Sequence, residues 1–115
     1  MEFLGRNRGY DNVTDYSLTE DSRTGNSCHF TVKGRVSVNE SSHLENALKA
    51  TVEEGITDII INMNLVSQLS SVGIRVLITM HKILRAKRGR LRIESPSENV
   101  RNVIGMVALN ELMLE

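Results

Sequence analysis

Two adjacent serines, Ser70 and Ser71, are the residues of this sequence whose type and position could support chemistry. They follow an apolar run at residues 58–63 and open a segment with helical periodicity, so a buried strand passes into a helix there. Functional groups collect at the carboxyl ends of parallel strands, and a helix N-terminus offers free N–H groups and partial positive charge. A phosphate on either serine would be stabilised there. Alternatively, Ser70 is only a helix cap and Gly73 only permits close helix–strand packing.

The other reactive side chains form no recognisable catalytic or metal-binding set. His29, His43 and His81 lack a second ligand at metal spacing, and the carboxylates are scattered. The sequence also contains no glycine-rich phosphate loop. It therefore predicts no enzyme, no metal site and no cofactor. We expect His29 and its neighbour Cys28 to be structural, and the two other histidines to face solvent or to be satisfied locally. A small α/β enzyme would need His29 or His81 beside one of the two serines.

Composition and charge restrict the class of protein further. The 115 residues suffice for one domain, and 14 basic residues balance 14 acidic ones, so the formal net charge is zero. Nucleic acids and acidic membranes normally require a basic face, so we expect neither as a partner. The N-terminus lacks an apolar leader, and no apolar run approaches the ~20 residues that cross a bilayer. With the single cysteine, Cys28, these features predict a cytoplasmic protein.

Hydrophobic periodicity predicts a hairpin followed by alternating helices and strands. Residues 1–15 are predicted to be a flexible lead-in, and residues 16–115 to form a single domain. The strands are predicted at residues 16–20, 30–33, 58–63 and 91–93. A turn at residues 21–27 joins the first two strands, and the isoleucines of the third fit a central strand covered on both faces. Residues 109–115 fit either a strand or a helical turn.

Capping residues and glycines mark three helices. Ser42 and Glu45 have the spacing of a capping box, and Gly55 terminates this first helix. The second helix is predicted at residues 71–88, and Ser95 is the predicted cap of the third. This order of elements predicts an α/β fold, in which helices pack against a mostly parallel sheet of four to five strands that begins with the N-terminal hairpin.

The segment around the two serines resembles the signature of STAS domains of the anti-sigma factor antagonist type. It reads Leu69-Ser70-Ser71-Val72-Gly73-Ile74-Arg75-Val76-Leu77. The resemblance extends to the strands and turns at residues 32–36, 58–63, 89–93 and 95–97, and it covers roughly residues 16–113. It implies a STAS-like fold for the whole domain and a protein of bacterial origin.

Three positions depart from the common pattern of that family. The acidic residue that begins the motif is Ser70 here. The position of the Ser/Thr that is phosphorylated in the Asp-Ser-Ser/Thr-Gly members is Val72, and the Asp that commonly follows an upstream Gly-x-x turn is Ser37. Because valine cannot accept phosphate, the resemblance implies Ser71 or, alternatively, Ser70 as the phosphorylation site. We favour Ser71, because it lies nearer the helix and is the serine retained in both forms of the family motif.

The resemblance also implies partners and a function. Unphosphorylated members bind a serine-kinase anti-sigma factor or a related switch kinase, phosphorylation releases them, and a PP2C-type phosphatase resets the cycle. For this chain it implies a phosphorylation-controlled switch in transcription regulation. The alternative is a constitutive scaffold or sensor STAS domain without phosphorylation. The residues expected to bind the partner surround the serines: Ser70, Ser71, Val72, Gly73, Ile74, Arg75 and Ile78. Ile74 and Ile78 are expected either to lie off the core stripe of their helix or to pack against the third helix.

Overall fold

The computed structural model describes residues 15–106 and 113–114, and these form a five-stranded sheet with three helices. The elements in chain order are β1 (Ser17–Thr24), β2 (Ser27–Val36), α1 (Val38–Glu53), β3 (Asp58–Leu69), α2 (Ser71–Ala86), β4 (Arg90–Glu94), α3 (Glu98–Met106) and β5 (Met113–Leu114). Strand β1 pairs antiparallel with β2, and every other pairing is parallel. The predicted fold class is therefore confirmed. The predicted lead-in lies outside the described residues apart from Asp15.

The C-terminal segment, for which the sequence left two alternatives open, contains a short strand. Met113 and Leu114 form β5, which pairs with Arg92 and Ile93 of β4. The remainder of residues 109–115 lies outside the described residues.

The N-terminal hairpin is longer than its sequence pattern indicates. The prediction of a turn at residues 21–27 is wrong, because β1 continues to Thr24 and only Gly25 and Asn26 form the turn. Gly25 has φ +60, a left-handed conformation that glycine adopts readily. The sequence pattern does not reveal the full length of this edge strand, because its side chains are mostly polar and do not alternate with apolar ones.

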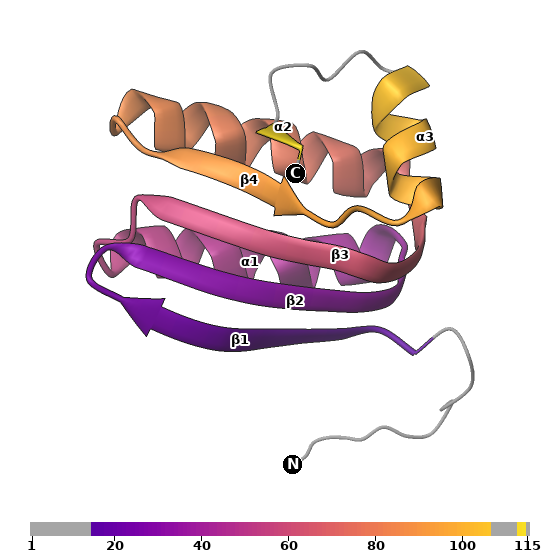
Figure 1. The fold of residues 1–115 in the computed structure, drawn as a ribbon, viewed down its shortest axis with the longest axis horizontal. Coiled ribbons are helices and arrows are strands. Elements are labelled where there is room, and N and C mark those ends of the chain that lie inside the picture. The colour runs from indigo at the N-terminus through magenta and orange to yellow at the C-terminus, as the bar shows by residue number, and fades with distance from the viewer. Residues whose placement is uncertain (1–14, 107–112, 115) are drawn as a thin grey trace.

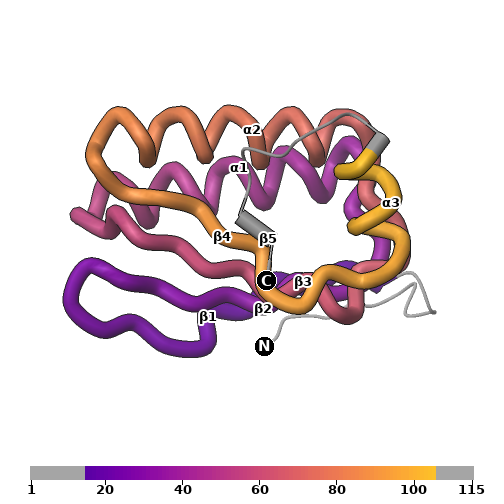
Figure 2. Tube along the Cα trace, turned by 45° about the horizontal axis from the view of Figure 1, so that its top comes forward, coloured from indigo at the N-terminus to yellow at the C-terminus, as the bar shows by residue number. Residues whose placement is uncertain are grey.

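Helices α1 and α2 cover one face of the sheet (Figures 1 and 2), and α3 lies against β3 at one end of the molecule. The side chains that alternate along the strands toward these helices are fully buried. The largest fully buried side chains are Val32, Leu44, Leu48, Ile59, Ile61, Met63, Leu77, Met80, Leu84, Leu91, Ile93 and Ile104. Ile60 points to the opposite face and is half-buried. The prediction that this central strand is covered on both faces is therefore wrong for the face that carries Ile60.

Helix α1 begins one turn earlier than predicted. Its N-cap is Ser37, whose hydroxyl donates a hydrogen bond to the carboxylate of Glu40. Ser42 and Glu45 lie inside the helix, so the predicted capping box is wrong. Both serine–glutamate pairs have the same spacing, and β2 selects the earlier one because it continues directly to Val36.

Helix α3 begins later than predicted. Its first residue is Glu98, and the hydroxyl of Ser97 accepts a hydrogen bond from the N–H of Val100 at 3.2 Å. The prediction of Ser95 as the cap is therefore wrong, and Ser95 instead has a left-handed φ of +50 in the loop. Ser97 also donates its hydroxyl hydrogen to the carbonyl of Val66 at 2.7 Å, which fixes the start of α3 to β3. No helix within residues 15–106 combines the length and the hydropathy needed to cross a membrane.

Candidate functional site

Ser70 holds the junction between β3 and α2. It is the N-cap of α2, and its hydroxyl accepts a hydrogen bond from the N–H of Gly73 at 3.1 Å. Its own N–H donates to the carbonyl of Val36, the last residue of β2, at 3.0 Å. Its hydroxyl also lies 3.4 Å from the hydroxyl of Ser41 on α1. The half-buried Ser70 side chain is thus engaged in fixing three elements to one another.

Ser71 differs from its neighbour in exposure and in partners. It is the first residue of α2, its side chain is exposed, and it makes no hydrogen bond through its hydroxyl to a described residue. The first turn of α2 contains no acidic residue. A negative group on Ser71 would therefore face the positive end of the helix dipole without repulsion from its own helix.

The capping role of Ser70 predicts a clear difference between two alanine variants. Ser70→Ala removes the acceptor for the N–H of Gly73 and is expected to lower the free energy of unfolding by about 1 kcal/mol. Ser71→Ala removes no hydrogen bond to a described residue, and we expect a change within about 0.5 kcal/mol. Ser70→Asp keeps an N-cap acceptor and should remain close to wild type. Urea unfolding followed by circular dichroism measures all three, and equal losses for both alanine variants would contradict the assignment.

The first turns of α1 and α2 meet at Ser41 and Gly73. Ser41 is fully buried, and its hydroxyl donates to the carbonyl of Ser37 at 2.6 Å. A Cβ on Gly73 would lie 2.7 Å from Cδ1 of Leu69 and 3.1 Å from the Ser41 hydroxyl. A side chain at this position would therefore require Leu69 and Ser41 to shift. The sequence analysis missed Ser41, since nothing local distinguishes it from the other hydroxyl residues of α1.

The predicted partner-binding residues separate into accessible and buried groups. Arg75 is exposed and Ile78 half-buried, four and seven positions after Ser71, so all three share one face of α2. Val72 is half-buried, whereas Gly73 and Ile74 are buried. Ile74 is 7% exposed and belongs to the core, so the expectation that it lies off the core stripe is wrong. The buried face of α2 is broad because this helix packs against both α1 and β4.

Comparison of the sequence with models of protein families identifies the kind of domain that contains this junction of β3 and α2. The family model described as the STAS domain matches residues 18–114. The chain belongs to the STAS domain family. Its motif around Ser70 and Ser71 lies in the matched range, at the junction of β3 and α2.

Solved structures confirm that the chain has the STAS fold. The anti-sigma factor antagonist SpoIIAA in its unphosphorylated form has a TM-score of 0.73 and 20% identity, covering 88% of each chain. An anti-sigma factor antagonist from Mycobacterium paratuberculosis has a TM-score of 0.73 and 22% identity, covering 85% of each chain. The phosphorylated form of the Bacillus cell fate determinant SpoIIAA has a TM-score of 0.68 and 20% identity, covering 88% of this chain and 91% of its own. No curated protein sequence matches the chain significantly.

His29 and His81 of this STAS domain lie far from the serine pair. His29 contacts Asp21 and Glu94. Nδ1 of His43 lies 2.8 Å from the hydroxyl oxygen of Tyr16, and the two groups form a hydrogen bond. His81 lies ten residues after Ser71 on α2, about 15 Å along the helix axis. It is buried and its Nδ1 lacks a hydrogen-bond partner among the described residues, so the expectation of a solvent-facing or locally satisfied side chain is wrong for His81.

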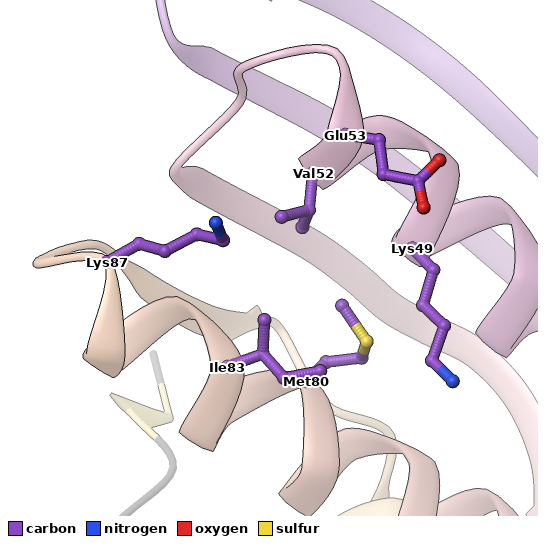
Figure 3. Close-up of a pocket in the computed structure, with 6 residues that line it drawn as sticks. All are labelled: Lys49, Val52, Glu53, Met80, Ile83 and Lys87. Carbon is purple, nitrogen blue, oxygen red and sulfur yellow. The ribbon is translucent and has the colours of Figure 1, made fainter.

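A cleft opens between the C-terminal halves of α1 and α2 (Figure 3). It has a volume of about 260 Å³ and is lined by Lys49, Val52, Glu53, Met80, Ile83 and Lys87. Ile83 lies about 18 Å along α2 from Ser71, so the cleft is separate from the serine junction of the STAS domain. The described residues contain no cluster of three His, Cys, Asp or Glu side chains that could hold a metal ion. Cys28 is buried, and burial raises the pKa of its thiol, which keeps it protonated.

Proposed function

We propose that this STAS domain is a non-catalytic protein-binding switch controlled by phosphorylation of Ser71. The division of labour between the two serines carries the proposal. The hydroxyl of Ser70 is committed to capping α2, whereas that of Ser71 is exposed and free of hydrogen bonds to described residues. A kinase needs an accessible hydroxyl, so the geometry favours Ser71 as the acceptor over Ser70.

The proposed partner is a serine-kinase anti-sigma factor or a related switch kinase. The similar structures that support this choice are anti-sigma factor antagonists, and SpoIIAA among them has been solved with and without phosphate. The unphosphorylated domain binds the kinase, phosphorylation releases it, and a PP2C-type phosphatase resets the switch. This cycle operates in the cytoplasm of a bacterium and regulates transcription. Neither nucleic acid nor membrane takes part, in keeping with the zero formal net charge.

The proposed interface surrounds Ser71 on the exposed face of α2. Val72, Arg75 and Ile78 offer it a combination of apolar surface and one positive charge. A phosphate adds about −1.5 to −2 charges, and at the centre of an interface this charge must lose its water. A loss of about 3 kcal/mol corresponds to roughly a hundredfold lower affinity, which suffices to release a partner.

Mass spectrometry of the protein isolated from its native cells tests the proposal directly. Fragmentation across residues 64–75 should locate phosphate on Ser71, and the Ser71→Ala protein expressed in the same cells should carry none in this segment. Phosphate on Ser70 in the wild-type protein would transfer the switch to that residue. Absence of phosphate under all growth conditions would reject the switch.

A constitutive scaffold or sensor domain is the second candidate function. It is favoured by Val72, which replaces a hydroxyl residue of the family motif with a side chain that cannot accept phosphate. Partner binding that is unaffected by incubation with the cognate kinase and ATP would support this function over the switch.

A further inference from the structure

The face of the sheet opposite α1 and α2 carries a band of charged side chains with His29 near its middle. In β2, residues on this face alternate with the buried ones, and His29 is flanked there by Ser27 and Thr31. The described helices α1 and α2 lie on the other side (Figure 2). The side chain of His29 is 28% exposed, so it is neither buried in the core nor fully solvated.

Both ring nitrogens of His29 contact a carboxylate. Nδ1 lies 3.2 Å from Asp21 on β1, and Nε2 lies 2.6 Å from Glu94 on β4. His29 is in register with Ile60 on β3, so the contact with Glu94 passes over an entire intervening strand. The imidazole on β2 therefore contacts side chains from both β1 and β4. These two strands are not neighbours in the sheet and share no backbone hydrogen bonds.

The chemistry of imidazole limits when both contacts can be hydrogen bonds. The protonated ring has two N–H donors and can satisfy both carboxylates, whereas the neutral ring has one donor and one acceptor. Loss of the proton leaves one carboxylate facing a ring nitrogen lone pair. We propose that His29 is a pH-operated clamp on the open sheet face, which joins β1 to β4 when protonated and releases one of them when neutral.

The positively charged side chains nearest to His29 in register either pair with Asp58 or lie further along the strand. On β4, Arg92 faces His29 across Ile60, but Arg92 is paired with Asp58 on β3 at 3.4 Å. The other charged groups on this face are more distant in register. Arg90 lies 3.8 Å from Asp58, and Lys33 follows Thr31 toward the other end of β2.

The balance of these effects sets the pH range of the clamp. Burial alone would lower the pKa of His29, but the hydrogen bonds to Glu94 and Asp21 outweigh it and raise the pKa above its ordinary value of about 6.5. The clamp is thus fully closed below about pH 6.5, and its contribution to stability disappears as the pH rises through the raised value.

The clamp adjoins the segment that leads to the serine junction. Glu94 is the last residue of β4, and the loop after it continues to Ser97, whose N–H donates to the carbonyl of Met63 at 3.1 Å. Loss of the contact between His29 and Glu94 would therefore first affect the loop that connects β4 to α3. The clamp itself does not depend on the phosphorylation of Ser71.

Nuclear magnetic resonance titration of the histidine rings tests the clamp in the intact protein. In wild type we expect the His29 ring to titrate with a midpoint above about 6.5. Asp21→Asn and Glu94→Gln each remove one negative acceptor and should each lower this midpoint. Glu53→Gln, which removes a carboxylate on α1 on the other side of the sheet, is the matched control and should leave the His29 midpoint where it is. An unchanged His29 midpoint in both Asp21→Asn and Glu94→Gln would overturn the proposal.

Urea unfolding between about pH 5.5 and pH 8.5 tests the consequence for stability. The difference in free energy of unfolding between wild type and His29→Gln should shrink as the pH rises, because glutamine does not titrate. A difference that is constant with pH overturns the clamp even where the ring titrates as expected. Should His29→Gln fail to fold, the same pH series compares wild type with Glu94→Gln, which removes one of the two negative charges that favour the protonated ring. The stability difference between these two proteins should also shrink as the pH rises, and a difference that is constant with pH overturns the clamp.

Discussion

Ser71→Asp is expected to weaken binding of the partner kinase by roughly a hundredfold or more, whereas Ser71→Ala should bind like wild type. The aspartate places a negative charge where phosphate would lie, in the middle of the proposed interface with Val72 and Ile78. Alanine keeps the neutral, compact surface of the unmodified serine. Surface plasmon resonance against the serine-kinase anti-sigma factor that binds the wild-type domain measures both affinities.

Ser71→Asp should lose affinity without losing its fold. An acidic residue in the first turn of a helix interacts favourably with the dipole, and Arg75 lies one turn further on the same face. Unfolding experiments should therefore find this variant at least as stable as wild type, to within about 0.5 kcal/mol. This behaviour separates a change at the interface from damage to the domain.

Ala50→Glu is the matched control for the added charge. Ala50 is exposed on α1, about 18 Å along that helix from its first turn, so its charge lies outside the proposed interface. We expect Ala50→Glu to bind the kinase like wild type. Equal affinity of Ser71→Asp and wild type would contradict a switch at Ser71. If Ser70→Asp alone lost binding, Ser70 would be the acceptor.

Gly89→Ala is expected to destabilise the domain by about 3 kcal/mol, a large share of the stability of a small domain. Gly89 joins α2 to β4 and passes directly over the backbone at Thr57. An added Cβ would lie 1.8 Å from the carbonyl oxygen of Thr57 and 2.7 Å from its carbonyl carbon. The same oxygen accepts the N–H of Arg90 at 2.9 Å, so moving it also disturbs the first hydrogen bond of β4. Thermal and urea unfolding measure the loss.

Gly105→Ala provides the contrasting substitution. Gly105 is exposed in α3, and a Cβ there would have no neighbour within 4 Å. Alanine in a helix is favoured over glycine, so this variant should be stabilised by about 0.5 kcal/mol. A comparable loss in both variants would show that the Thr57 contact is not the cause of the Gly89→Ala effect.

Features that depend on local periodicity could be read from the sequence. Three such patterns predicted the order of strands and helices correctly. They are the apolar alternation at Phe30 and Val32, the apolar run Ile59–Ile61, and the helical spacing of Val76 and Met80. The serine pair was also placed correctly at the start of α2, because serine caps and the end of an apolar strand are adjacent in sequence.

Features that depend on distant neighbours could not be read in this way. The spacing of a capping box occurs at both Ser37 and Ser42, and the pairing of β2 with β3 decides between them. The third strand was predicted to end at residue 63, but β3 continues to Leu69 because residues 65–69 pair with β2. Ile74 is buried because two elements cover α2. The carboxylates of Asp21 and Glu94 lie 8 and 65 residues from His29, so no local pattern reports their contact.

The order of the strands in the sheet, β1-β2-β3-β4-β5, has a consequence for synthesis of the chain on the ribosome. Each strand pairs with the one translated immediately before it, so no strand has to wait for a partner that is still to be made. The nascent sheet can grow from the hairpin outward, with the newest strand always forming its free edge. When β3 emerges, one of its edges pairs with β2 at once, and the other edge stays open until α2 and β4 have been synthesised. This order shortens the time in which the isoleucine-rich edge of β3 could pair with a neighbouring nascent chain.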